Sequence, residues 1–114
     1  MRLLIIEDDP LLLRSLSRIL MAAGYDIAGT PGSVAAALAT IAAGSFDAAI
    51  LDANLRRQSA APIAAALKER AVPFVVVTGY NHRQLAETFS GAPCLSKPFE
   101  VDQLLTLMQQ LKGA

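Results

Sequence analysis

The chain has 114 residues, of which 54% are apolar, and ten Lys and Arg residues balance ten Asp and Glu residues. This composition excludes a disordered chain, a nucleic-acid binder that works through a basic face, and a polybasic membrane anchor. A single Cys, and the lack of an apolar run of about 18 residues, point to a cytoplasmic protein without an internal disulfide or a membrane span.

The start of the chain predicts a strand followed by a capped helix. Arg2 to Ile6 is an apolar run that stops at three acids, which indicates a buried strand. Asp9 and Pro10 are typical of a helix start, and Gly24 is typical of a helix end. The apolar stripe predicted for this helix consists of Leu12, Leu16, Ile19, Leu20 and Ala23.

A second strand and helix are predicted next. Residues Asp26 to Thr30 form the strand, and Ser33 and Gly44 mark the two ends of the helix. Ala48 to Leu51 is a further apolar run, and it stops at Asp52. The stripe predicted for the second helix consists of Val34, Leu38, Ile41 and Ala42.

The second half of the chain continues the alternation. Asn54 to Ala61 is polar and predicts a loop, and a helix opens at Pro62 and runs through Glu69. Pro73 to Val77 is a β-branched strand, Gln84 to Phe89 a short weak helix, and Cys94 to Ser96 a minimal strand. The final helix has an apolar stripe of Val101, Leu104, Leu105, Met108 and Leu111. Alternating strands and helices predict an α/β fold with a parallel sheet covered on both faces.

Polar side chains follow the predicted strands at the points where they end. The first strand delivers Glu7 and Asp8, the third Asp52, the fourth Thr78 and the fifth Lys97. In open α/β sheets, ligands bind at this carboxyl edge. Clustered carboxylates repel one another unless a cation neutralises them, and Mg²⁺ prefers oxygen ligands. Asp can accept a phosphoryl group covalently, and a Lys and a hydroxyl can stabilise that group. The pattern therefore indicates a magnesium site beside an Asp nucleophile.

Four segments stand in this order along the chain: Ile5–Asp9, Leu51–Asp52, Val77–Gly79 and Lys97–Phe99. On these segments, the whole chain resembles the receiver domain of two-component response regulators, the CheY-like family. The resemblance implies a doubly wound, five-stranded parallel sheet with strand order 2-1-3-4-5, the flavodoxin-like (βα)5 fold. It also implies one receiver domain over residues 1–114, and we expect no output domain.

The resemblance implies a role for each residue of the metal site. Asp52 matches the phospho-accepting Asp, which also contacts the metal, and Asp8 matches the direct ligand of Mg²⁺ or Mn²⁺. Glu7 matches an acidic neighbour that acts through a bound water. Asn54 matches the position that gives a backbone carbonyl to the metal. Asp9 is interpreted as a helix cap rather than a ligand.

The resemblance assigns the remaining residues to the phosphoryl group and to the switch. Thr78 matches the hydroxyl residue that hydrogen-bonds the phosphoryl group and moves on activation. Lys97 matches the Lys that pairs with a phosphoryl oxygen, and its bond to Pro98 is usually cis in the family.

Three departures from the family pattern stand out. The stretch from Ala53 to Ser59 lacks the usual Pro-Gly turn. Together with Pro73-Phe74 and the segment Val77–Tyr80, it makes the chain similar to the atypical FATGUY-type single-domain subgroup. Cys94 occupies the place of the switch aromatic and cannot swing as a large ring, so we interpret it as a small core residue. Tyr80, or the neighbouring residues 81–83, is predicted to carry the signal, and Tyr80 is predicted to shield the phosphoryl group from water.

The predicted function is two-component signal transduction. A sensor histidine kinase or a histidine phosphotransferase is expected to supply the phosphoryl group to Asp52. The expected output is binding to a downstream protein, phosphorelay or a phosphate sink. We expect a monomer or weak dimer that is not a turnover enzyme, because it catalyses only its own phosphoryl transfer and autodephosphorylation.

Two alternatives come from other classes. A pseudo-receiver would keep the fold as a binding module without phosphorylation, but the complete set of site residues argues against it. A small phosphatase with an Asp nucleophile commonly needs a second acid two residues later, and Asn54 cannot act as an acid or base there.

Overall fold

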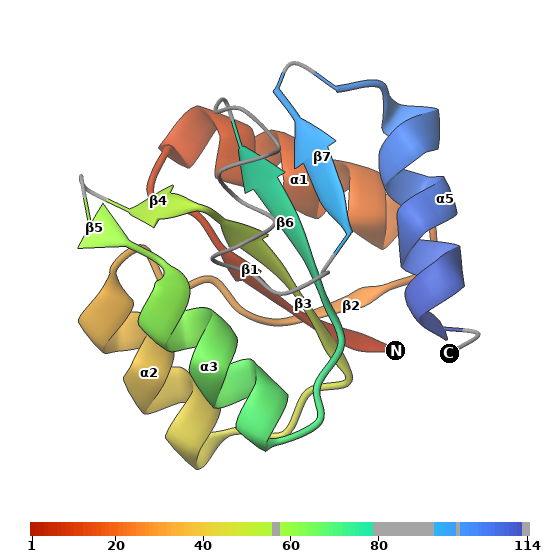
Figure 1. Ribbon diagram of the computed structural model, residues 1–114. Helices are drawn as coiled ribbons and strands as arrows, with labels where there is room; N and C mark the ends of the chain where they lie inside the picture. The colour runs from red at the N-terminus through yellow and green to blue at the C-terminus, as the bar shows by residue number, and fades with distance from the viewer. Residues whose placement is uncertain (56–57, 79–92, 98, 113–114) are drawn as a thin grey trace.

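The computed structural model describes residues 1–55, 58–78, 93–97 and 99–112. Its elements in chain order are β1 (Arg2–Ile6), α1 (Pro10–Ala22), β2 (Asp26–Gly29), α2 (Val34–Ala43), β3 (Ala48–Asp52), β4 (Asn54–Leu55), β5 (Gln58–Ser59), α3 (Ala61–Glu69), β6 (Phe74–Thr78), β7 (Cys94–Ser96) and α5 (Val101–Lys112) (Figure 1). The predicted helix at Gln84 to Phe89 lies outside the described residues.

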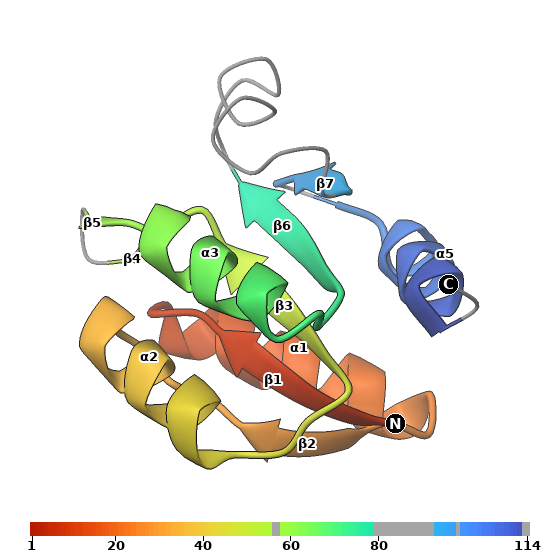
Figure 2. The ribbon, with the colours of Figure 1, turned by 60° about the horizontal axis from the view of Figure 1, so that its bottom comes forward.

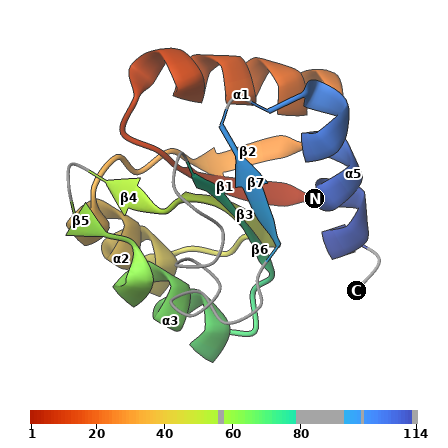
Figure 3. The same cartoon turned by 45° about the horizontal axis from the view of Figure 1, so that its top comes forward.

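Five strands form one parallel sheet in the order β2-β1-β3-β6-β7. Counted along the chain, this is the predicted order 2-1-3-4-5. α2 and α3 cover one face of the sheet, and α1 and α5 cover the other (Figure 3). The central strand β3 is buried along its whole length, because it has a strand on each side and helices on both faces.

Two buried clusters lie on the two faces of the sheet. Alternate residues of β1 divide between them, as the two-residue repeat of a strand requires. Leu4 and Ile6 pack with the cluster under α2 and α3, and Leu3 and Ile5 pack with the cluster under α1 and α5. A run of apolar residues without alternation is therefore the sequence signature of a strand buried on both faces.

The predicted helix caps are confirmed. The Asp9 carboxylate accepts the N–H of Leu11 at 3.0 Å, and the Ser33 hydroxyl accepts the N–H of Ala36 at 3.1 Å. Gly24, just beyond the end of α1, has a φ of 96°, a conformation that glycine adopts without steric cost. None of the described helices is long and apolar enough to cross a membrane.

The predicted stripe of α2 is wrong in part. Ala37 and Ile41 are buried, whereas Leu38 is 36% exposed and Ala42 is exposed. Nine of the ten residues of α2 are apolar, so the periodicity of apolar residues carries little information about which side faces the sheet. A small Ala at the centre of the buried face lets the helix lie close to the sheet.

The predicted polar loop at Asn54 to Ala61 is also wrong. β4 and β5 pair there as a short antiparallel hairpin, and α3 begins at Ala61. Leu55 is fully buried in this segment. Figure 2 shows the hairpin leading directly into the first turn of α3.

Candidate functional site

The end of β1 places two acids at the carboxyl edge of the sheet. The strand runs buried through Ile6, and the chain then leaves the sheet at Glu7. The Glu7 N–H donates to the carbonyl of Pro31 at 3.3 Å, which ties this turn to the segment before α2. Because the Asp9 carboxylate caps α1, Glu7 and Asp8 are the acids of this turn that remain for the site.

The end of β3 places a third acid beside them. β1 and β3 are neighbours, with Ile6 opposite Leu51, so Asp52 follows at the same edge. The chain continues from β1 to α1 on one face and from β3 toward α3 on the other face (Figure 3). The site therefore lies where the direction of winding reverses, the point at which such sheets open into a crevice.

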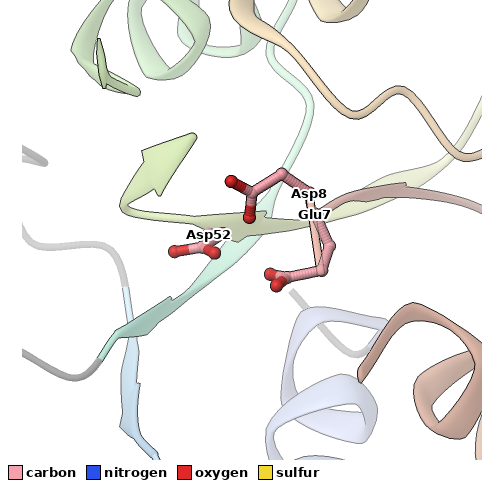
Figure 4. A group of neighbouring side chains, drawn as sticks. All are labelled: Glu7, Asp8 and Asp52. Carbon is pink, nitrogen blue, oxygen red and sulfur yellow. The ribbon is translucent and has the colours of Figure 1, made fainter. Parts of the chain in front are cut away.

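Glu7, Asp8 and Asp52 form a compact acidic cluster. One carboxylate oxygen of each lies within 4.8 Å of the others (Figure 4). Glu7 is 3% exposed and Asp52 is 8% exposed, whereas Asp8 is partly exposed. Placing acids so close together in a largely buried position costs free energy unless positive charge or protons compensate them.

Lys97 supplies part of that compensation. Its Nζ lies 3.3 Å from Oδ2 of Asp52 and 3.6 Å from Oε1 of Glu7. Its backbone N–H donates to the carbonyl of Thr78 at 2.8 Å, which fixes the chain beyond β7 against the end of β6. The ammonium group therefore bridges two acids that come from different strands.

Glu7 is strongly perturbed. Burial raises its pKa from 4.5 to about 8, and the hydrogen bond and negative charge of Asp52 add to this effect. The charge of Lys97 and the N–H of Asp9, 3.3 Å from Oε1 of Glu7, lower the pKa but do not offset the burial. In the absence of a metal, Glu7 therefore holds a proton at neutral pH.

Thr78 ends β6 beside this cluster. Val77, the residue before it, lies opposite Asp52 in the register of β3 and β6. Thr78 is 1% exposed, although its side chain is polar. Buried hydroxyl groups in a carboxyl-edge site are suited to hydrogen-bond an anionic group.

A comparison with protein families matches residues 3–109 to the response regulator receiver domain. The chain belongs to this family. The match covers the segments that carry all three acids, Thr78 and Lys97, so the resemblance seen in the sequence is confirmed at the level of the family. A comparison with curated protein sequences gave no match.

Several solved structures have the same fold. SdrG from Sphingomonas melonis Fr1 is 38% identical, with 98% of this chain and 96% of that chain covered and a TM-score of 0.85. TrrA from Thermotoga maritima, solved with Mg²⁺ and BeF, is 26% identical, with 96% and 97% covered and a TM-score of 0.85. A receiver protein from Sinorhizobium medicae WSM419 is 24% identical, with 100% and 95% covered and a TM-score of 0.90.

The structure of this receiver domain brings most of the predicted site residues to one edge. Glu7, Asp8, Asp52 and Lys97 come together, and Thr78 lies at the end of the adjoining strand. The predicted roles of Tyr80 and Pro98 fall on residues outside the described part of the chain. The FATGUY-type subgroup remains a prediction.

Asn54 follows Asp52 by two residues, whereas Cys94 lies in β7, which β6 separates from the strand that carries Asp52. Asn54 begins β4, and its backbone pairs with Ser59. Cys94 begins β7 opposite Val76, is partly buried, and packs against the cluster under α2 and α3. Burial raises the pKa of its thiol, which keeps the thiol protonated at neutral pH.

The acidic cluster fits a hard divalent cation. Its ligand atoms are carboxylate oxygens from three residues on two strands, the donor type that Mg²⁺ selects. Its three carboxylates carry more negative charge than the single ammonium group of Lys97 can balance. Bound Mg²⁺ would replace the proton of Glu7 and neutralise this excess.

Sequence reasoning missed the apolar residues that surround the turn after Asp52. Ala53, Leu55 and Ala60 are all at most 2% exposed. The only sign of burial in the sequence is Leu55, a single apolar residue between polar neighbours. One such residue is weak evidence for a buried segment. The stretch lacks the family's usual Pro-Gly turn, and the structure has the hairpin of β4 and β5 in its place.

Proposed function

We propose that this receiver domain is phosphorylated on Asp52 in a Mg²⁺-dependent reaction, with a histidine kinase or a histidine phosphotransferase as the donor. The observation that carries the proposal is the placement of Lys97, whose ammonium group bridges Asp52 and Glu7 within the acidic cluster. A lysine that only balanced surface charge would not need two largely buried partners from two different strands.

Asp52 is the nucleophile in the proposed reaction. One of its carboxylate oxygens forms a bond to phosphorus, and the bond between phosphorus and the donor's imidazole nitrogen breaks. The electron pair of that bond stays with the imidazole, and the product is an acyl phosphate on Asp52. Lys97 pairs with an oxygen of the phosphoryl group, and the hydroxyl of Thr78 donates a hydrogen bond to another.

Asp8 and Asp52, with Glu7 acting through water and Asn54 through its backbone carbonyl, would hold the Mg²⁺ or Mn²⁺. The bound cation supplies neutralisation of the negative charge that the phosphoryl group brings to an acidic site. The solved complex of TrrA with Mg²⁺ and BeF supports the assignment, because that receiver is 26% identical to this one over 96% of this chain.

The proposed role in the cell is signalling rather than turnover of a substrate. The chain would catalyse only its own phosphorylation and dephosphorylation, as a monomer or weak dimer in the cytoplasm. Its output would be binding to a downstream protein, relay of the phosphoryl group, or removal of phosphate from a kinase.

Intact-mass measurement after incubation with Mg²⁺ and acetyl phosphate tests this proposal. The wild type is expected to gain one phosphoryl group, and Asp52→Asn and an EDTA-treated sample are expected to gain none. Asp47→Asn is a matched control, because Asp47 is an exposed acid before β3, at the opposite edge of the sheet. A wild type without an adduct, from either acetyl phosphate or a histidine phosphotransferase, would contradict the proposal.

A further inference from the structure

The backbone that follows Asp52 is held in place by a closed set of hydrogen bonds. The Ala53 N–H donates to the carbonyl of Val77 at 3.1 Å, and the Ala53 carbonyl accepts the N–H of Ala60 at 3.0 Å. Between these two residues, Asn54 lies opposite Ser59 and Leu55 opposite Gln58. The hairpin therefore starts and ends at one point, directly beside the acid that the proposed function phosphorylates.

One side chain anchors this hairpin to the interior. Leu55 is fully buried and belongs to the cluster that includes Ile6, Ile63 and Leu67. Gln58 and Ser59, on the opposite strand, are exposed. Leu55 is thus the one large apolar group that the described part of the hairpin places in the core.

The backbone pairing alone does not hold such a hairpin. Each of its strands has two residues, and isolated two-stranded hairpins are at best marginally stable in water. Two further hydrogen bonds support the end of the hairpin. The Ala60 N–H donates to the Ala53 carbonyl, and the Ser59 hydroxyl accepts the N–H of Ala61 at 3.1 Å. Among the described residues of the hairpin, Leu55 makes the largest apolar contact with the core, and it holds the hairpin against the sheet together with the hydrogen bond from the Ala53 N–H to the Val77 carbonyl.

We infer that Leu55 is a positioning residue for the metal and phosphoryl site. It acts through the backbone of Ala53 and Asn54, which it holds beside the carboxylate of Asp52. The inference rests on the proposed function, since it assigns the hairpin to the same site. Groups that orient the ligands of a metal commonly change metal affinity by about 10- to 100-fold when they are removed.

The test compares two leucines of one cluster. Leu55 and Leu67 are both fully buried under α2 and α3, but Leu67 lies near the end of α3, away from the carboxyl edge of the sheet. Leu55→Ala and Leu67→Ala create the same kind of cavity and are expected to cost comparable stability. Leu55→Met keeps the volume and the apolar character, so it is the conservative rescue variant.

Two readouts separate positioning from stability. The first is the Kd for Mg²⁺, measured by calorimetry on the full chain. We expect this Kd to rise about tenfold or more in Leu55→Ala. In Leu67→Ala and Leu55→Met, we expect it to stay at the wild-type value. The second is hydrogen exchange at the Ala60 amide without metal. We expect it to accelerate in Leu55→Ala relative to the amide of Ala49, and not in Leu67→Ala.

Either of two results would overturn the inference: an unchanged Mg²⁺ affinity in Leu55→Ala, or an equal loss in both alanine variants. If Leu55→Ala does not fold, Leu55→Val provides the same comparison with a smaller cavity. A wild type that binds Mg²⁺ but takes no phosphate would defeat the proposed function alone, and the comparison of Kd values would still decide the role of Leu55.

Discussion

The proton held by Glu7 leads to a quantitative prediction about Mg²⁺ binding. Because burial and Asp52 raise the pKa of Glu7 to about 8, the metal-free site is mostly protonated at pH 7. Mg²⁺ binding favours the deprotonated cluster, so the cation has to displace that proton. We therefore expect the affinity for Mg²⁺ to increase as the pH rises through 8, and Glu7→Gln to abolish this dependence.

The size of the effect follows from the pKa. With a pKa of about 8, about one Glu7 in eleven is ionised at pH 7 and about ten in eleven at pH 9, so the apparent Kd for Mg²⁺ should fall about tenfold between them. At pH 7, binding should release about 0.9 protons per Mg²⁺. In Glu7→Gln, the Kd should be independent of pH over this range and the proton release close to zero.

Calorimetric titration in buffers with different ionisation enthalpies measures both quantities. The pH dependence of the free energy of unfolding provides a second test, because the raised pKa of Glu7 determines its direction. The folded-state pKa of Glu7 lies above 4.5, so its contribution to the metal-free domain is fully present below about pH 4.5 and is lost as the pH rises through about 8. A constant Kd from pH 7 to pH 9, with no proton released at pH 7, would refute the reasoning about Glu7.

Three further predictions address single residues. Lys97→Met should lower the free energy of unfolding of the metal-free domain, measured in urea, by about 1–2 kcal/mol. The loss should be smaller with saturating Mg²⁺, because the cation replaces the lost positive charge. Equal losses in both conditions would contradict this prediction. Ala71, just after α3, has a φ of 57°, so Ala71→Gly should raise the free energy of unfolding by about 1 kcal/mol; an unchanged urea midpoint would argue against strain there. Tyr80→Ala, at a position outside the described residues, should lose the phosphoryl group faster, and an unchanged lifetime of the acyl phosphate would refute the shielding role.

Much of the site was predictable because the same feature of the sequence determines both the strand and its end. The run Leu3–Ile6 is buried on both faces, and the acids that follow it mark the point where the chain leaves the sheet. The same holds at Leu51 and Asp52. Once parallel strands are predicted, their ends fall at one edge, so the grouping of Glu7, Asp8 and Asp52 follows without knowledge of distances.

The features that the sequence did not predict depend on contacts between distant segments. The buried face of α2 depends on how closely Ala37 approaches the sheet, and its neighbours are almost all apolar. The hairpin at β4 and β5 depends on the pocket that the core offers to Leu55. The raised pKa of Glu7 requires the depth of burial and the approach of Asp52, neither of which is encoded in the local pattern.

The proposed function depends above all on Asp52 as the residue that carries the phosphoryl group. Borohydride treatment of the domain after reaction with acetyl phosphate and Mg²⁺ converts a phospho-aspartate to homoserine, and peptide mass spectrometry locates the changed residue. We expect homoserine at position 52, none at Asp8 or Asp47, and none at any position when Mg²⁺ is withheld. Homoserine at another acid, or none in the complete reaction, would refute the assignment of Asp52.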